Sequence, residues 1–199
     1  MSRWIETIAL KDGVLMHLSD HQERMDRTIR DMLGIENSII LEATLTPPAG
    51  LDHGLVKCRI VYDTVIHMIN WEPYNIRDHG SIAIVHNNDL EYSTKKEDRS
   101  ALENLIKKAQ VDDVIIVQHG KVTDASYANL IFRKNQDWVT PSTPLLAGTM
   151  RNRLLRQGKI KESPVHVEDL MAFDGFKYIN AMLDMENSPE LSMQIIRGK

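Results

Sequence analysis

The stretch Gly120–Phe132, which reads GKVTDASYANLIF, decides the fold of this chain. It follows the short apolar run Val114–Val117, and the turn residues His119-Gly120-Lys121 separate the two. Four consecutive apolar residues beside a turn are typical of a buried strand, and the run Tyr127–Phe132 predicts another strand. The stretch therefore predicts a sheet in which the acidic residue Asp124 lies between two strands.

Toward the N-terminus, the sequence predicts a hairpin, a helix and further strands. Asp12-Gly13 is a tight turn between two apolar runs, Trp4–Leu10 and Val14–Leu18. Ser19 is the expected cap of an amphipathic helix that ends at Gly34. Runs rich in β-branched residues then predict strands at Val56–Tyr62, Val65–Trp71 and Ile82–His86.

Toward the C-terminus, helices and strands are mixed. Apolar residues at helical spacing predict a helix over Arg99–Ala109, and another helix is expected over Thr149–Arg156. Further strands are expected at Trp138-Val139, Tyr178–Leu183 and Met193–Ile196.

The polar segment Asn87–Asp89 is the expected connector between two lobes, residues 1–88 and 89–199. Mixed strands and helices in two lobes indicate the α+β class. A functional site is then expected in the cleft between the lobes.

Composition and charge exclude several classes of protein. The chain has 199 residues, a formal net charge of −4 and one cysteine, Cys58, expected as a buried thiol in a strand. No apolar run is long enough to cross a bilayer and no secretory signal is visible, so a cytoplasmic protein is expected. Charges of both signs are interspersed, which argues against a nucleic-acid partner. The eight histidines are scattered and form no metal-ligand motif, so no metal site is expected.

Several motifs follow one another along the chain: His21–Met25 (HQERM), Lys95–Arg99 (KKEDR), Gly120–Phe132, Thr140-Pro141 and Leu146–Arg151 (LAGTMR). Together they resemble the class IV aminotransferases, the group that holds branched-chain and D-amino-acid aminotransferases and aminodeoxychorismate lyase. The resemblance covers most of the chain. It implies a smaller N-terminal α/β sandwich-like lobe and a C-terminal mixed β-barrel-like lobe with helices, as in D-amino-acid aminotransferase-like enzymes. It also implies pyridoxal 5'-phosphate (PLP) as cofactor, a small amino substrate and a homodimer.

Lys95 is the residue that the resemblance assigns to the cofactor, because the family's catalytic lysine often lies four residues before an arginine, here Arg99. A lysine forms a Schiff base only when its amine is partly neutral, which burial and a neighbouring cation achieve. On its own, Lys95-Lys96 is typical of a solvated charged pair. A register slip of one residue would select Lys96 instead.

Asp124 holds the place of the family carboxylate that keeps the cofactor's ring nitrogen protonated. Most relatives carry Glu there, and Asp is one methylene shorter. The alternative is that Asp124 shapes the loop between two strands, as short polar residues often do.

The resemblance places the phosphate at Gly148, Thr149 and Met150, because a helix start offers free N–H groups and a favourable dipole. Arg24 aligns with the arginine that pairs with this phosphate, and Ser126 is a further candidate. The alternative for Arg24 is an ordinary exposed arginine of a helix, and the alternative for Ser126 is a serine that only shapes a turn.

Substrate contacts are expected from Arg59, as a carboxylate-binding arginine, and from Asn180 and Ala181, in a late strand motif. The alternative for Arg59 is that it faces outward from its strand. The alternative for the late motif is that its apolar members pack in the core. The motif Ile5-Glu6-Thr7 stands close to residue 1, so the segment that precedes it in full-length relatives is expected to be missing.

The sequence thus predicts a PLP-dependent enzyme that acts on an amino acid or amino-bearing carboxylate. It would either transaminate this substrate or eliminate from it, as aminodeoxychorismate lyase does. The alternative is a non-catalytic PLP-binding or interaction domain derived from the same fold.

Overall fold

The computed structural model describes residues 2–197, which form two compact units. Unit 1 runs to Ile76 and includes Thr94–Asp98, whereas unit 2 is made of Arg77–Ser93 and the chain from Arg99 onward. The predicted connector at Asn87–Asp89 lies inside unit 2. The division into lobes 1–88 and 89–199 stays a prediction.

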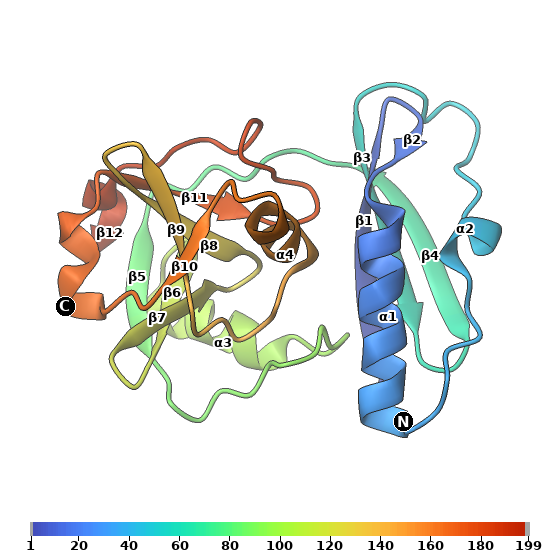
Figure 1. Cartoon of the computed structure of the whole chain (residues 1–199), viewed down its shortest axis with the longest axis horizontal. Coiled ribbons are helices and arrows are strands. Elements are labelled where there is room, and N and C mark those ends of the chain that lie inside the picture. Colours follow the sequence, from blue (N-terminus) through green and yellow to red (C-terminus); the bar gives the residue numbers. More distant parts are fainter. Residues whose placement is uncertain (1, 198–199) are drawn as a thin grey trace. The chain divides into compact units, whose positions relative to one another are not determined.

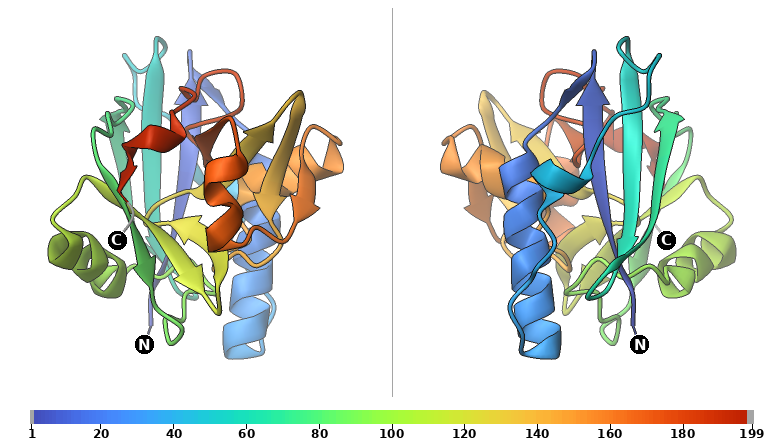
Figure 2. Two further views of the ribbon diagram at one scale, coloured as in Figure 1. Left: turned by 90° about the vertical axis from the view of Figure 1, so that its left-hand side faces the viewer. Right: turned by 90° about the vertical axis from the view of Figure 1, so that its right-hand side faces the viewer.

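Unit 1 is an antiparallel sheet with a long helix, α1 (Leu18–Leu33), and a single turn, α2 (Leu41–Thr44). The strand order is β2 (Val14–Leu15), β1 (Trp4–Lys11), β3 (Leu55–Tyr62) and β4 (Ile66–Pro73). Figures 1 and 2 show α1 running along the strands. Met25 and Ile29 of α1 pack with Trp4, Ile8 and Ile60 in one apolar core. This core confirms the predicted hairpin and strands of unit 1, because one apolar side of each strand lies against α1. The second hairpin strand is shorter than predicted, since β2 ends at Leu15 and Leu18 belongs to α1.

The start of α1 differs from the prediction. The helix begins at Leu18 after His17, whose backbone is left-handed with φ 53°, so Ser19 lies inside the first turn and is not its cap. The left-handed residue turns the chain from β2 straight into the helix, which leaves no room for a cap at Ser19. The predicted end is confirmed, because Gly34 has φ 69° and donates its N–H to the Arg30 carbonyl.

Unit 2 contains two four-stranded sheets. The first has the order β12 (Ile196–Arg197), β5 (Ile82–His86), β6 (Asp113–Gln118) and β7 (Lys121–Ala125). The second has the order β10 (Lys161–Ser163), β9 (Asp137–Pro141), β8 (Asn129–Lys134) and β11 (Gly175–Ile179). Strands β5 and β6 are parallel and β6 and β7 are antiparallel, so the sheet is mixed.

Helices α3 (Ser100–Ala109) and α4 (Thr149–Arg156) lie where the sequence predicted them. Apolar residues of α3 pack with β6, and Figure 2 shows α3 beside β5. Met150 and Leu154 of α4 pack with Ile131 of β8 and Ile179 of β11. This packing fixes the start of α4 near the ends of these strands.

The two late strands are shifted from their predicted positions: β11 begins at Gly175 and ends before the predicted Leu183, and β12 begins only at Ile196. Strand β11 ends at Ile179 because the Asn180 side chain accepts hydrogen bonds from the N–H groups of Met182 and Leu183 and turns the chain. Met193–Ile195 is a 3₁₀ turn, η2, in which the Ser192 hydroxyl accepts from the Gln194 N–H. Another 3₁₀ turn, η1, spans Val167–Ala172.

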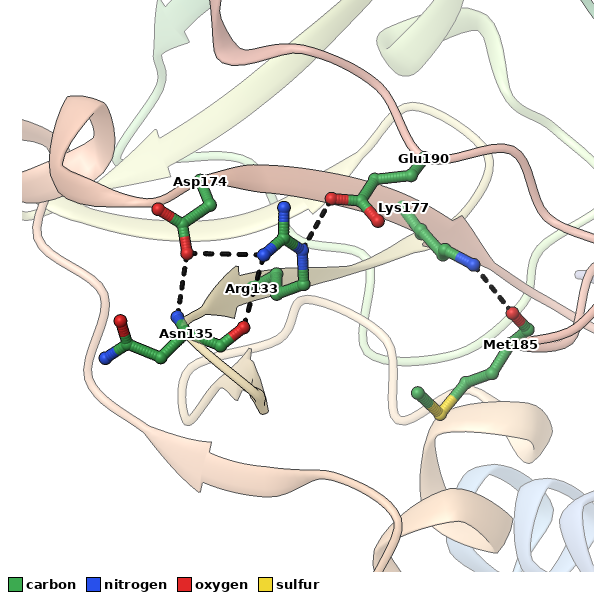
Figure 3. Close-up of polar contacts among 6 residues, drawn as sticks. All are labelled: Arg133, Asn135, Asp174, Lys177, Met185 and Glu190. Atoms are coloured by element: carbon green, nitrogen blue, oxygen red, sulfur yellow. Dashed lines mark hydrogen bonds and ion pairs between the residues drawn. The ribbon is translucent and has the colours of Figure 1, made fainter.

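Charged side chains tie the segment after β11 to the second sheet (Figure 3). Arg133 donates to Glu190 at 2.6 Å and pairs with Asp174 at 3.4 Å. Lys177 donates to the Met185 carbonyl at 2.7 Å. The contacts of Met185 and Glu190 hold in place the chain that follows Asn180.

The mixed sheets and few helices confirm the predicted α+β class. Cys58 is buried in β3, as predicted, and burial raises the pKa of its thiol to about 12. Within residues 2–197 no helix has both the length and the apolar character that a membrane span needs.

Candidate functional site

Asp124 lies at the end of β7 with 4% of its surface exposed, and both carboxylate oxygens accept hydrogen bonds. Its Oδ1 accepts from Asn129 Nδ2 at 2.6 Å, and its Oδ2 accepts from the Leu146 N–H at 2.9 Å. The turn from Ala125 to Ala128 is closed by a backbone hydrogen bond of 3.0 Å, which brings Asn129 beside Asp124. The β7–β8 connection therefore holds a buried carboxylate in one fixed orientation.

Burial raises the pKa of Asp124 from its usual 3.8 to about 6, although the Leu146 N–H and the Asn129 amide lower it. The folded protein therefore binds this proton more tightly than the unfolded chain does. Its contribution to stability is present below pH 3.8 and is lost as the pH rises to about 6. A carboxyl group that titrates this high is suited to share a proton with a basic ring nitrogen.

We expect Asp124→Asn to remove this pH dependence. Relative to the variant, the unsubstituted protein should lose about 3 kcal/mol of unfolding free energy as the pH rises across this window. Urea unfolding of the cofactor-free proteins at several pH values between 3.8 and 6 would measure the difference. A difference that stays constant with pH would contradict the raised pKa.

The start of α4 offers backbone donors. Gly148 is its N-cap residue, and the first helical hydrogen bond runs from the Asn152 N–H to the Gly148 carbonyl. The N–H groups of Thr149 and Met150 therefore have no acceptor within the helix. A Cβ at position 148 would overlap the side-chain oxygen of Asn129. Only glycine allows this close approach, and the N–H donors without a helical acceptor, together with the helix dipole, suit an anion such as a phosphate.

Ser126 is held inside unit 2 by two other residues. Arg99 Nη2 donates to the Ser126 carbonyl at 2.7 Å. Burial raises the pKa of Asp113, whereas hydrogen bonds from the Ser126 hydroxyl and N–H lower it. The hydroxyl that was predicted to reach a phosphate therefore has Asp113 as a neighbour, and the phosphate role of Ser126 stays a prediction.

In unit 1, Arg24 is buried against Glu6 and His21. Arg24 donates to the Glu6 carboxylate through Nε at 2.8 Å and Nη2 at 2.5 Å, and His21 Nδ1 donates to the same carboxylate at 2.6 Å. The alternative of an exposed helix arginine is wrong, because 6% of Arg24 is exposed. Burial alone raises the pKa of Glu6, but the Arg24 charge and both donors outweigh it and lower it to about 2.

No role for Glu6 or His21 was predicted from the sequence. The available signals were a glutamate among the apolar residues of β1 and a histidine one helical turn before Arg24. Glu6 shares the α1-facing side of the sheet with Ile60, its register partner. Side chains at spacing i, i+3 on a helix face the same way, so His21 and Arg24 reach one carboxylate.

Lys95 lies beside the start of β1. The Ile5 N–H donates to the Lys95 carbonyl at 2.9 Å, and Trp4 pairs with Lys96 in an antiparallel bridge. Burial lowers the pKa of His21, and the charges of Arg24 and Lys95 add to this effect against the opposing influence of Glu6. Unit 1 thus brings Lys95 into the electrostatic neighbourhood of the Glu6–His21–Arg24 network.

The predicted substrate residues have contacts of their own within their units. Arg59 pairs with Thr7 across β1 and β3, so it faces the side of the sheet opposite Glu6. Asn180 accepts hydrogen bonds within its own turn, and Ala181 is half-buried in that turn. Substrate binding by Arg59, Asn180 and Ala181 stays a prediction.

Comparisons with known proteins agree on one family. The model of the amino-transferase class IV family matches residues 93–186. An uncharacterized protein of Haemophilus influenzae is 38% identical over 180 residues, which are 89% of this chain and 96% of that protein.

Solved structures extend the comparison. A Haemophilus somnus structure, described as a candidate 4-amino-4-deoxychorismate lyase, is 34% identical with a TM-score of 0.86, covering 93% of this chain and 98% of that one. A hypothetical aminotransferase of Mycobacterium tuberculosis in its PLP-bound form has a TM-score of 0.76 at 16% identity, over 95% and 80% of the two chains. The latter likeness concerns the fold alone.

Proposed function

Because the chain belongs to the class IV aminotransferase family, we propose that it is a PLP-dependent enzyme acting on an amino acid or amino-bearing carboxylate. One observation carries the proposal: the buried Asp124 carboxylate is fixed on both oxygens beside a helix start whose first N–H donors have no acceptor within the helix. A carboxylate for a ring nitrogen and donors for a phosphate are the two features that PLP requires of a protein. The residues of unit 2 therefore fit the cofactor.

Each proposed role follows from the chemistry of the side chain. Lys95 Nζ is the nucleophile that attaches the cofactor and later takes the substrate's α-proton. Asp124 holds a proton on the ring nitrogen. Thr149, Met150 and Arg24 bind phosphate oxygens, and Gly148 lets the backbone approach them. When bound, PLP supplies an electron sink for the charge that develops at the α-carbon.

Elimination is the first reaction to test. The Haemophilus somnus protein, at 34% identity, and a Schizosaccharomyces pombe relative, 31% identical over 104 residues, are both described as candidate aminodeoxychorismate lyases. In both reactions of the family, the substrate amine would first displace Lys95 Nζ from the cofactor, and the freed amine of Lys95 would then take the α-proton. In elimination, the electron pair released at the α-carbon would expel the β-substituent as enolpyruvate, which gains a proton to become pyruvate, and an aromatised product would remain. In transamination, Lys95 would instead return its proton at another carbon. We also infer a homodimer and a cytoplasmic location.

The test uses the unsubstituted chain. The purified protein is incubated with PLP, freed of unbound cofactor and reduced with borohydride, and its peptides are analysed by mass spectrometry. We expect the added cofactor mass on the peptide that contains Lys95. The loaded protein is then offered 4-amino-4-deoxychorismate, with pyruvate release as readout, and amino acid and keto acid pairs. The proposal is wrong if the protein binds no PLP or carries it at a site other than Lys95.

A further inference from the structure

Asn129 contacts both the Asp124 carboxylate and the segment that leads into α4, although no role was predicted for it. Its side chain is buried at the first residue of β8. Its Nδ2 donates to Asp124 Oδ1 at 2.6 Å and to the Leu146 carbonyl at 2.8 Å. Its Oδ1 lies against Gly148, where a Cβ would overlap it.

We propose that Asn129 is a positioning residue that couples the Asp124 carboxylate to the segment Leu146–Gly148, which leads into α4. The inference rests on the proposed function, because it assigns the carboxylate to the ring nitrogen and the helix start to the phosphate. Asn129 itself touches neither end of the cofactor in this scheme. It sets the distance between the two groups that do.

The hydrogen bonds form a closed loop. Asn129 bonds Asp124 and Leu146 through one nitrogen, and the Leu146 N–H returns to Asp124 Oδ2 at 2.9 Å. Both protons of the Asn129 amide are therefore used, and rotation of the amide would place its oxygen against the carboxylate. A shift of the Leu146–Gly148 segment must move the Asn129 amide, and with it the carboxylate.

Stability alone gives no reason for this arrangement. A buried carboxylate and amide lose their hydration, and a well-packed apolar pair of similar volume would avoid that loss. The carboxylate and the amide nitrogen are bonded to one another and to Leu146, and they fix a single geometry, which is what a site of two separated anchors needs.

A double-mutant cycle between Asn129→Ala and Gly148→Ala tests the coupling, with PLP and pyridoxal as probes. Pyridoxal lacks the phosphate, so its affinity reports on the Lys95 and Asp124 side alone. We expect Asn129→Ala to weaken binding of both probes by about 10- to 100-fold, because Asp124 loses a buried donor. Gly148→Ala should also weaken pyridoxal binding, since its Cβ displaces Asn129. In the Asn129→Ala background, Gly148→Ala should change pyridoxal affinity by less than about twofold.

Ser188→Ala is the matched control. It removes one buried side-chain hydrogen bond of the same unit, from Ser188 Oγ to the Tyr178 carbonyl at 2.6 Å, and should leave both affinities unchanged. Asn129→Asp keeps the side-chain shape but loses the donor, so it should weaken pyridoxal as Asn129→Ala does. Urea unfolding of the cofactor-free proteins completes the same cycle without any ligand.

The outcomes separate the two proposals. The coupling is wrong, although the proposed function stands, if Gly148→Ala leaves pyridoxal affinity unchanged. It is equally wrong if Gly148→Ala lowers this affinity by the same factor in the unsubstituted protein and in Asn129→Ala. The coupling is also wrong if Gly148→Ala destabilises the cofactor-free protein equally with and without Asn129. If the unsubstituted protein forms no adduct at Lys95, the proposed function fails and the positioning role fails with it.

Discussion

Lys95→Ala is expected to abolish covalent attachment of PLP and to lower turnover by at least about 10³-fold, because it removes the nucleophile and the proton carrier together. Lys96→Ala should keep both properties. The charge of Lys95 acts on His21, which lies one helical turn from Arg24, whereas the backbone of Lys96 pairs with Trp4 in an antiparallel bridge. Borohydride reduction followed by peptide mass analysis, together with initial rates, measures both effects.

Lys95→Arg separates charge from nucleophilicity. The guanidinium keeps the positive charge near His21 but stays protonated and cannot attach the cofactor. This variant should fold and bind PLP reversibly, yet lose turnover as Lys95→Ala does. Covalent attachment that persists in Lys95→Ala and disappears in Lys96→Ala would show that the register is shifted by one residue.

Periodic patterns predicted most of the elements. The apolar spacing of Arg99–Ala109 and the Gly148-Thr149 helix start were local signals, and α3 and α4 lie where these signals indicated. Predictions based on single polar residues did worse. Ser19 is a residue type that often caps helices, but α1 starts two residues earlier than predicted, because the left-handed residue His17 is its N-cap.

The roles of Asn129 and Glu6, which hold the candidate site residues in place, could not be predicted from the sequence. Asp124 was found by its motif, whereas Asn129, five residues later in the same motif, bonds Asp124 only because the Ala125–Ala128 turn closes. Glu6 and Arg24 are eighteen residues apart and meet because β1 and α1 pack together. Such pairs depend on the tertiary fold, which residue type and spacing alone do not specify.

Glu6→Ala is expected to lower the free energy of unfolding by about 3–5 kcal/mol, because removing one partner leaves the buried Arg24 without its counter-charge. The fully buried Glu6 carboxylate accepts from both Arg24 and His21, so two donors lose their acceptor at once. Glu23→Ala on the same helix is the control, since the exposed Glu23–Arg27 pair should contribute at most about 1 kcal/mol. Urea unfolding at neutral pH compares the two, and equal losses would contradict a buried ion pair at Glu6.

Acid should remove the same contribution from the unsubstituted protein. Its neighbours lower the pKa of Glu6 from 4.5 to about 2, so the stabilisation is complete above pH 4.5 and is lost as the pH falls toward 2. The difference in unfolding free energy between the unsubstituted protein and Glu6→Gln should therefore shrink across this window. Glu6→Gln should also weaken PLP binding more than pyridoxal binding, because Arg24 then lacks the carboxylate that orients it. If PLP and pyridoxal lose the same factor in affinity, Glu6 has a role in folding only, and Arg24 does not bind the phosphate.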